Sequence, residues 1–535
     1  MICLLNYKVI IQNSTLIKEL TFPFGQVYFG GYLLYKGKCY YAEDLHDLLN
    51  EEGFFLRELN EIHGEFVFIQ AGQGEAIAIV DRKRSIPLFY YKEGASWIIT
   101  DKIAPKPDDS FNQTAVKEFL LTGFTANEKT LYDGIYQIEA GSYIQIQEAG
   151  EIINKEYYQF YHHPVDKDVE QFSLELQTVF HQVFEDLIVR LKNKVPILPL
   201  SGGYDSRIIA LLLKEYGMEH IASFTYGKRE NKEALVSKDI ADRLGLKWDF
   251  VEYKKDDWHR WYHSDEWKQY VDFAVNGSSM AHLQDWPAVR EIVSKQDREY
   301  VFIPGHSGDF VAGSHLAYEI TEDRVFSAED VVQFTLNKHH KLWEMDKGLQ
   351  DSAGDVLAEI RRSFGDLPYQ TNEQASALFE YWDWKERQAK FIINSVRVYE
   401  FYEKGWEIPL WDDRLMEFFK TVPVDLRFKK YLYDYTLHQM YPDYFSKPEK
   451  PAGKETSLKQ KYGVFYNTAK KIYNKKKLYQ KYYTEPMEWY GIYKSYPEYL
   501  GALSFKHNRI KYSQPYNINS FLAKDYIQSL KGESK

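Results

Sequence analysis

Strands and helices alternate between residues 195 and 253, and this order restricts the fold more than any other feature of the chain. Two stretches, RIIALLLKEYG and EALVSKDIADRLG, have apolar residues at helical spacing, and they separate three short apolar runs, VPILPL, IASFTYG and KWDFVEY. Gly217 and Gly245 stand where the two helices should end. Strands that alternate with helices form βαβ units with parallel strands. The chain is therefore predicted to be an α/β protein with a parallel sheet.

The residues before about 160 follow a different pattern. Segments such as GEFVFIQAGQGEAIAIVD alternate apolar and polar residues and are interrupted by glycines, which is typical of short strands. A helical stretch is expected near residues 42–53, and a long amphipathic helix over 169–193 begins the second domain. We predict a β-rich layered domain over 1–160, an α/β domain with helical additions over 165–450, and a basic, aromatic extension over 451–535.

Composition and charge exclude several classes of protein. The net charge of -11 argues against a general nucleic-acid binder, although the extension carries 16 Lys and Arg against 6 Asp and Glu. No stretch approaches the roughly 18 uncharged apolar residues that a membrane helix needs, so no membrane partner is expected. The two cysteines, Cys3 and Cys39, exclude a disulfide framework and a four-cysteine zinc site. A soluble protein of the cytoplasm is expected.

The segment LSGGYDSR, Leu200 to Arg207, directly follows the first of the three apolar runs and leads into a helix. Its paired glycines allow a tight turn, after which the N–H groups at the helix start point at one place and form an anion site. Ser201 and Ser206 add hydroxyl donors, and the Asp205 carboxylate can hold Mg²⁺ against phosphates. A plain strand-to-helix turn capped by Asp205 is the alternative. The position after a parallel strand favours a ligand site.

This segment and three others resemble a known family. SGGYDS resembles the pyrophosphate loop SGGxDS of ATP pyrophosphatases, and most of the chain resembles the asparagine synthetase superfamily, which includes β-lactam synthetases and lasso-peptide cyclases. GEFVFI and DRKRSIPLFYY, residues 81–91, are similar to glutaminase-domain signatures. PGHSGDFVAGS and EIPLWDDRLMEFFKTVPVDLRFKK, residues 407–430, are similar to signatures of the synthetase domain. The resemblance implies an Ntn-hydrolase-like β-sandwich followed by a parallel-sheet ATP-pyrophosphatase domain of the adenine nucleotide alpha hydrolase type.

The resemblance also implies an activity, that of an AMP-forming carbon–nitrogen ligase that uses ATP and Mg²⁺. A substrate carboxylate would attack the α-phosphorus of ATP, pyrophosphate would leave, and ammonia or an amine would then displace AMP. Two copies of the chain often pair in this family. The identity of the carboxylate stays open between free aspartate, a peptide side chain and a sugar acid.

The family's functional positions carry over to particular residues here. Asp205 and Asp309 match the two aspartates that hold the metal. Asp205, His306 and either Lys430 or Lys429 match positions of the reacting centre, and Lys430 fits the spacing better. The resemblance assigns nucleotide contacts to Leu200, Ser201, Gly202, Gly203, Asp205, Ser206, Tyr226, Gly227, Gly305 and Lys429.

The chain departs from the family at its beginning. Glutamine-dependent members expose a cysteine at position 2, whereas Ile2 stands here and should keep Met1 in place, so Cys3 has no free α-amine beside it. The RHRGPD and NGEIYN segments that clamp glutamine are also absent. We therefore predict a glutaminase-like domain without glutaminase activity. The nitrogen would come from free ammonia or from a substrate amine.

A second departure is His306, which replaces a glutamate of asparagine synthetases, and Phe310 replaces another acid. A histidine can transfer protons near neutral pH. These changes cast doubt on aspartate as the substrate. Two other functions remain open: a nucleotide-binding scaffold that has lost its chemistry, and an RNA-modifying ATP pyrophosphatase, which the basic, aromatic extension would suit although no CxxC element supports it.

Overall fold

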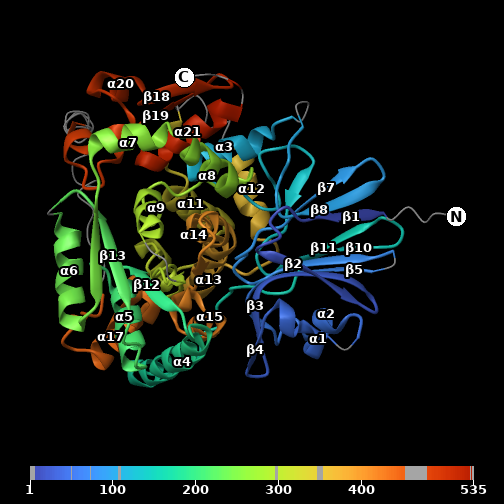
Figure 1. The fold of residues 1–535 in the computed structure, drawn as a ribbon, viewed down its shortest axis with the longest axis horizontal. Helices are drawn as coiled ribbons and strands as arrows, with labels where there is room; N and C mark the ends of the chain where they lie inside the picture. Colours follow the sequence, from blue (N-terminus) through green and yellow to red (C-terminus); the bar gives the residue numbers. More distant parts are fainter. Residues whose placement is uncertain are drawn as a thin grey trace.

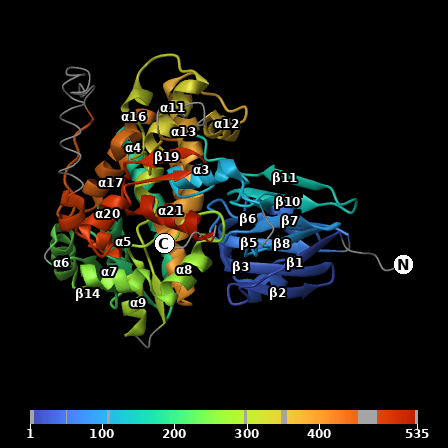
Figure 2. The same ribbon diagram turned by 90° about the horizontal axis from the view of Figure 1, so that it is seen from above.

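The computed structural model describes residues 6–49, 51–72, 74–106, 110–229, 231–295, 299–345, 354–451, 479–530 and 532. It has the predicted mixed α/β class. Most strands of the first 156 residues gather on one side of the molecule, whereas the parallel sheet and most helices form the other side (Figures 1 and 2). The exact limits of the three predicted regions stay a prediction.

Two sheets form the first unit. Its strands are β1 (Tyr7–Ile10), β2 (Ile17–Phe22), β3 (Gly25–Tyr35), β4 (Lys38–Tyr40), β5 (His63–Ala71), β6 (Ala76–Val80), β7 (Phe89–Glu93), β8 (Ser96–Thr100), β9 (Ile135–Gln137), β10 (Ser142–Ile146) and β11 (Ile152–Glu156). One sheet has the order β1-β8-β7-β9, and the other has the order β11-β10-β6-β5-β3-β2 with β4 beside β3. Val67 and Ile69 from one sheet share a buried cluster with Ile99 from the other, as alternating strands predict.

The second unit contains the predicted parallel sheet. Its strands are β12 (Val195–Pro199), β13 (Ala222–Gly227), β14 (Lys247–Glu252), β15 (Tyr300–Phe302) and β17 (Gly405–Trp406). The order is β14-β13-β12-β15-β17, and every neighbouring pair is parallel. Helices α5 (Tyr204–Glu215) and α6 (Lys232–Leu244) are the predicted crossovers, and α6 ends at Gly245 with φ 64°. Helix α4 (Val169–Arg190) ends three residues before the predicted limit.

Helices make up most of what remains. The α-helices not yet named are α1 (Leu45–Leu48), α2 (Phe54–Glu58), α3 (Gln113–Thr122), α7 (Lys255–Tyr262), α8 (Asp265–Val275), α9 (Trp286–Ser294), α10 (Gly308–Val311), α11 (Ala328–His339), α12 (Gly354–Ser363), α13 (Asn372–Trp382), α14 (Arg397–Phe401), α15 (Asp413–Lys420), α16 (Val424–Arg427) and α17 (Tyr431–Met440). A π-helix, η4 (Asp383–Ile392), and a 3₁₀ turn, η5 (Ile393–Val396), join α13 to α14. None of the helices within the described residues is long and apolar enough to cross a membrane.

The described part of the extension packs on the second unit. Its elements are η8 (Trp489–Ile492), α20 (Tyr496–Gly501), β18 (Ser504–His507), β19 (Ile510–Ser513) and α21 (Ile518–Leu530). Strand β19 pairs with β16 (Glu344–Met345), so the extension completes a small sheet with a segment more than 150 residues earlier in the chain. The lysine-rich run near residues 470–477, on which the RNA alternative partly rested, lies outside the described residues.

The loop after β6 fastens the two units together. The Lys83 ammonium lies 2.9 Å from the Asp413 carboxylate, and both side chains are buried. The indole N–H of Trp384 donates to the carbonyl of Arg82 at 2.7 Å. Arg190, which forms a buried ion pair with Glu407 at 2.9 Å within the second unit, also lies over the Tyr32 ring of the first unit, 4.4 Å from its centre. This loop belongs to the 81–91 signature, so the segment that resembles a glutaminase signature serves here as a contact between units.

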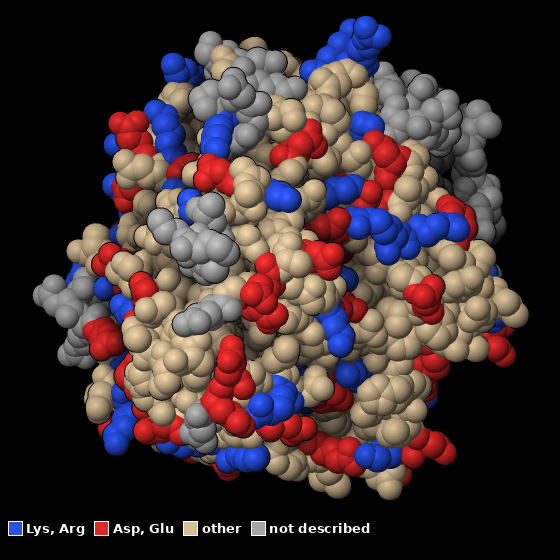
Figure 3. All heavy atoms as spheres, turned by 90° about the vertical axis from the view of Figure 1, so that its right-hand side faces the viewer, with Lys and Arg blue, Asp and Glu red and all other residues tan. Residues whose placement is uncertain are grey.

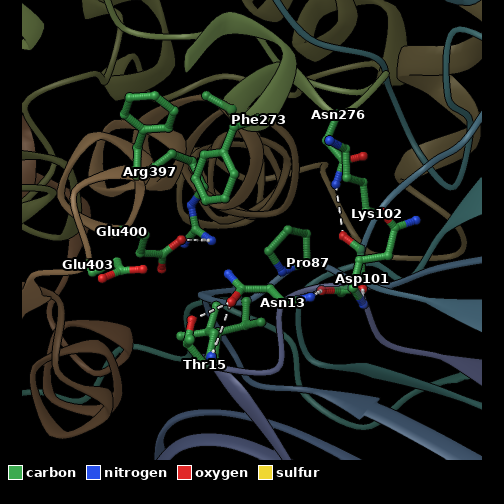
Figure 4. Close-up of a pocket in the computed structure, with 15 residues that line it drawn as sticks. Asn13, Thr15, Pro87, Asp101, Lys102, Phe273, Asn276, Arg397, Glu400 and Glu403 are labelled. Carbon is green, nitrogen blue, oxygen red and sulfur yellow. Dashed lines mark hydrogen bonds and ion pairs between the residues drawn. The ribbon is translucent and has the colours of Figure 1, made fainter. Parts of the chain in front are cut away.

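A cavity of about 330 Å³ also lies between the units (Figure 4). Asn13 and Asp101 line it from the first unit, and Phe273, Arg397 and Glu400 line it from the second. None of the predicted site residues lines this cavity. On the face at the right of Figure 1, basic and acidic side chains are interspersed, so that face has no single sign of charge (Figure 3).

Candidate active site

The loop between β12 and α5 has the geometry of an open anion site. Gly203 is the N-cap of α5, and no side chain caps the N–H groups at the helix start. The loop is held by its own serines: Ser201 N–H donates to Ser206 Oγ at 3.2 Å, and Gly203 N–H donates to Ser201 Oγ at 3.1 Å. Because α5 has 12 residues and its N-terminus follows a parallel strand, the open N–H groups favour a negatively charged ligand.

Asp205 and Asp309, which the sequence places far apart, come together in the structure. The backbone N–H of Asp309 hydrogen-bonds to the Asp205 carboxylate, and the Tyr433 hydroxyl donates to Asp205 Oδ1 at 2.9 Å. Gly305 allows this approach, because a Cβ there would lie 2.9 Å from Asp205 Cβ. The hydroxyl of Ser314 donates to Asp309 Oδ2 at 3.0 Å.

The two carboxylates suit a cation. Burial, followed by the charge of Asp309, raises the pKa of Asp205 to about 7, although Lys430 and the Tyr433 hydroxyl act in the opposite direction. Among the described residues, no group of three or more His, Cys, Asp or Glu side chains is arranged to hold a metal ion. Mg²⁺ normally takes one or two carboxylates and completes its shell with phosphates and water. The pair therefore fits Mg²⁺ bound together with a nucleotide.

Lys430, rather than Lys429, faces this pair. Lys430 Nζ donates to Asp434 at 3.0 Å, lies 5.2 Å from the centre of the Tyr204 ring, and lowers the pKa of Asp205. Lys429 is exposed, with its ammonium 5.5 Å from the centre of the Phe428 ring. Both lysines have positive φ, 56° and 61°, so a tight turn sends their side chains in different directions.

His306 follows β15 and bonds to Ser395 in the 3₁₀ turn η5. Its Nε2 lies 2.6 Å from Ser395 Oγ, and that hydroxyl donates to the carbonyl of Ile392 at 2.7 Å. Nε2 of His306 is then the donor, and Nδ1 keeps its lone pair. Burial, helped by His282, lowers the pKa of His306 to about 3. The sequence led us to expect an imidazole that titrates near neutral pH, whereas burial keeps it neutral.

The predicted adenine edge lies at the ends of β12 and β13. Leu200 N–H already donates to the carbonyl of Phe224 at 2.8 Å, and the Leu200 carbonyl accepts a hydrogen bond from the Thr225 hydroxyl, so one lone pair of that carbonyl is left for a ligand. The Tyr226 ring stacks on Tyr253, with centroids 5.3 Å apart. Gly227 has φ 123°, and a Cβ there would lie 3.1 Å from the carbonyl oxygen of Pro486 in the extension. The extension thus reaches this edge, which the sequence gave no reason to expect.

Arg207, in the first turn of α5, binds backbone oxygens. Its guanidinium donates to the carbonyl of Gly202 at 3.1 Å and to the carbonyl of Tyr444, so it braces the loop through backbone oxygens. Tyr433 and Ser395 are the contacts that the sequence reasoning missed. Tyr433 stands three residues after Lys430, and this helical spacing could have indicated it.

A family profile described as asparagine synthase matches residues 182–452, just over half of the chain. The chain belongs to the asparagine synthase family. The match includes the loop at Leu200–Arg207, Asp309 and both lysines, whose individual roles stay predictions.

Other comparisons add little. No curated protein matches the chain. A solved structure described as the allosteric regulatory enzyme of purine biosynthesis is 11% identical, with a TM-score of 0.17, over 59% of this chain and 58% of that one. Glutamine phosphoribosylpyrophosphate amidotransferase from B. subtilis, complexed with ADP and GMP, is 10% identical, with a TM-score of 0.18, over 53% and 62%. The chain spans about three fifths of each structure, and likeness at this level supports no conclusion about function.

Proposed function

We propose that this member of the asparagine synthase family activates a substrate carboxylate with ATP and then joins it to ammonia or an amine. The half-buried Asp205 beside Asp309, at the open start of α5, is the observation that carries the proposal. A carboxylate oxygen attacks the α-phosphorus, the bond to the bridging oxygen breaks, and pyrophosphate leaves. The nitrogen then attacks the acyl carbon, AMP departs with the C–O electron pair, and the nitrogen loses a proton.

Particular residues would serve each step. The N–H groups at the start of α5, with the hydroxyls of Ser201 and Ser206, bind the leaving pyrophosphate, and Lys430 offsets the charge that develops there. Asp205 and Asp309 would hold Mg²⁺, which neutralises phosphate charge when bound. The neutral His306 accepts a hydrogen bond from the attacking nitrogen at Nδ1 and so orients it.

The nitrogen source that we propose is ammonia or an amine, because the described residues offer no reactive cysteine that could attack glutamine. Residues 1–5, which include Cys3, lie outside the described residues. The described cysteine, Cys39, is half-buried, and burial raises the pKa of its thiol, which disfavours a reactive thiolate. A cytoplasmic location and pairing of two copies stay predictions.

Exchange of labelled pyrophosphate into ATP tests this proposal. With Mg²⁺ and a panel of carboxylic acids, the wild type should catalyse exchange with at least one acid. Lys430→Ala should reduce the rate about 100-fold or more, the usual effect of losing a charge that stabilises a transition state. Lys429→Ala is the matched control and should stay near wild type.

Absence of exchange with every acid would contradict the ligase proposal. If ATP binding then also survived Asp205→Ala unchanged, the scaffold alternative would replace it.

A further inference from the structure

Residues 485–488 of the extension, here called the extension turn, lie against the end of β13. The backbone N–H of Lys228, which directly follows β13, donates to the carbonyl of Pro486 at 2.7 Å. The indole N–H of Trp258, a buried side chain of α7, donates to the carbonyl of Met487 at 2.6 Å. The extension turn is therefore attached both to the end of the strand and to α7.

The extension turn is also fixed internally. The N–H of Met487 donates to Glu485 Oε2 at 2.8 Å, and the N–H of Glu488 donates to the carbonyl of Glu485 at 3.2 Å. The Glu488 carboxylate pairs with the Lys228 ammonium at 2.8 Å. Because both the N–H and the carbonyl of Met487 are bonded, its backbone is held in place next to β13.

Tyr226, one residue before the end of β13, has open backbone groups. The carbonyl of Phe224 accepts a hydrogen bond from Leu200 N–H at 2.8 Å on the β12 side. The carbonyl of Gly227 accepts one from Tyr253 N–H at 2.8 Å on the β14 side. Alternate residues of a strand bond to opposite neighbours, so Tyr226 faces the β12 side, where β12 has already ended. Among the residues that the structure describes, none hydrogen-bonds to the N–H or the carbonyl of Tyr226.

This donor and acceptor lie side by side at the carboxyl end of the sheet and complement adenine. Adenine presents a ring-nitrogen acceptor next to its N6 amino donor, so the N–H and the carbonyl of Tyr226 can bind both at once. Hydrogen bonds between strands lie close to the plane of the sheet. A base bound in the same way would lie roughly in that plane, with one of its flat faces toward each side of the sheet.

Met487 lies on one of these two sides. Successive side chains of a strand point to opposite faces, so position 227 faces away from the Tyr226 ring, which stacks on Tyr253. Gly227 has no side chain, and the Met487 sulfur lies 3.2 Å from the point that its Cβ would occupy. Met487 is half-buried, so part of its thioether stays open beside the end of the strand. The glycine thus leaves room for a side chain that comes from the extension.

We propose that the extension is part of the nucleotide site and that the Met487 thioether covers one face of the adenine base. A flexible, polarizable thioether makes favourable contacts with an aromatic ring. The inference rests on the proposed function for its ligand, ATP, but nucleotide binding can be measured without any turnover.

Equilibrium binding to the full chain tests the proposal. The probes are a non-hydrolysable ATP analogue and inorganic pyrophosphate, each titrated by calorimetry with Mg²⁺ present. Met487→Ala should weaken binding of the analogue about tenfold, because the base loses its thioether contact and the apolar area buried against it. Binding of pyrophosphate, which has no base, should stay unchanged, and this shows that the variant is folded and that the loop between β12 and α5 is intact.

Two further variants separate a contact with the base from a structural role. Met487→Leu keeps an apolar side chain of similar volume and should recover most of the affinity for the analogue. Met218→Ala, at another half-buried methionine beyond the far end of α5, is the matched control and should bind both probes as the wild type does.

Equal binding of the analogue by the wild type and by Met487→Ala would overturn the inference. Equal weakening of both probes would also overturn it, because the effect would then lie at the loop between β12 and α5, and so would a wild type that binds no analogue. Exchange of pyrophosphate into ATP, together with binding that does not depend on Met487, would keep the ligase and remove the inference. Binding that depends on Met487, without exchange for any acid, would keep this wall of the site and remove the ligase.

Discussion

Replacing Asp205 by asparagine should stabilise the protein while it abolishes the proposed chemistry. The half-buried Asp205 carboxylate lies beside Asp309, and partial burial together with that charge raises its pKa to about 7 from an ordinary value of 3.8. The folded protein therefore binds this proton more tightly than the unfolded chain does. Below pH 3.8 the group is protonated in both states, and ionisation has no effect on stability.

The magnitude follows from the raised pKa. Between pH 3.8 and 7, the free energy of unfolding falls by about 1.4 kcal/mol per pH unit, so the full penalty above pH 7 is about 4 kcal/mol as an upper estimate. Asparagine removes the charge. The attraction of Lys430 for the ionised carboxylate is already included in the pKa of about 7, and it is absent at low pH, where Asp205 is protonated. The pH dependence of the stabilisation is thus the sharper quantity, and it should be about 2.7 kcal/mol larger at pH 8 than at pH 5.

Urea unfolding at pH 5 and at pH 8, followed by tryptophan fluorescence with a chelator present, measures this difference. The two pH values lie on either side of the isoelectric point of about 5.8. Asp425→Asn, at an exposed carboxylate paired with Lys450, is the matched control and should show no such pH dependence. Mg²⁺ and ATP should then stabilise the wild type and not Asp205→Asn. A variant that is less stable than wild type by the same amount at both pH values would refute the reasoning.

Two further predictions concern the interface and His306. Lys83→Met leaves the Asp413 charge buried without its partner and should lower the free energy of unfolding by about 3 kcal/mol. Combining Lys83→Met with Asp413→Leu should recover most of that loss. If the losses from the two substitutions simply add in urea denaturation, the two residues are not energetically coupled. His306→Gln should leave the shape of the profile of rate against pH unchanged between pH 6 and 8, because the imidazole is already neutral. If the wild-type rate changes near pH 6.5 and that change disappears in the variant, His306 titrates during turnover and the prediction is wrong.

The sequence was sufficient for the parallel sheet and its loop because both depend on local patterns. Apolar runs and helical spacing determine β12, α5 and β13, and paired glycines mark the turn between strand and helix. The meeting of Asp205 with Asp309 depends on strand order, which local patterns do not determine. It follows from the pairing of β12 with β15, since the loops after adjacent parallel strands share one edge of the sheet.

The contacts that the later helices make could not be predicted from local sequence patterns. Ser395 reaches His306 because η5 follows a π-helix, and no feature of residues 383–392 indicated that the helical repeat would change there. The neutral state of His306 likewise depends on burial, which only the packed chain supplies.

The first unit supports the second unit in this structure, whatever its own activity. Its loop accepts a hydrogen bond from the Arg397 guanidinium at the carbonyl of Ser85, and Arg397 stands only two residues after Ser395, the partner of His306. Removing the unit would expose this buried arginine and leave Asp413 without Lys83. Both changes would destabilise the part of the second unit that holds His306. The first unit therefore supports the proposed active site even if it hydrolyses no glutamine, and we expect its removal to impair the proposed ligase activity.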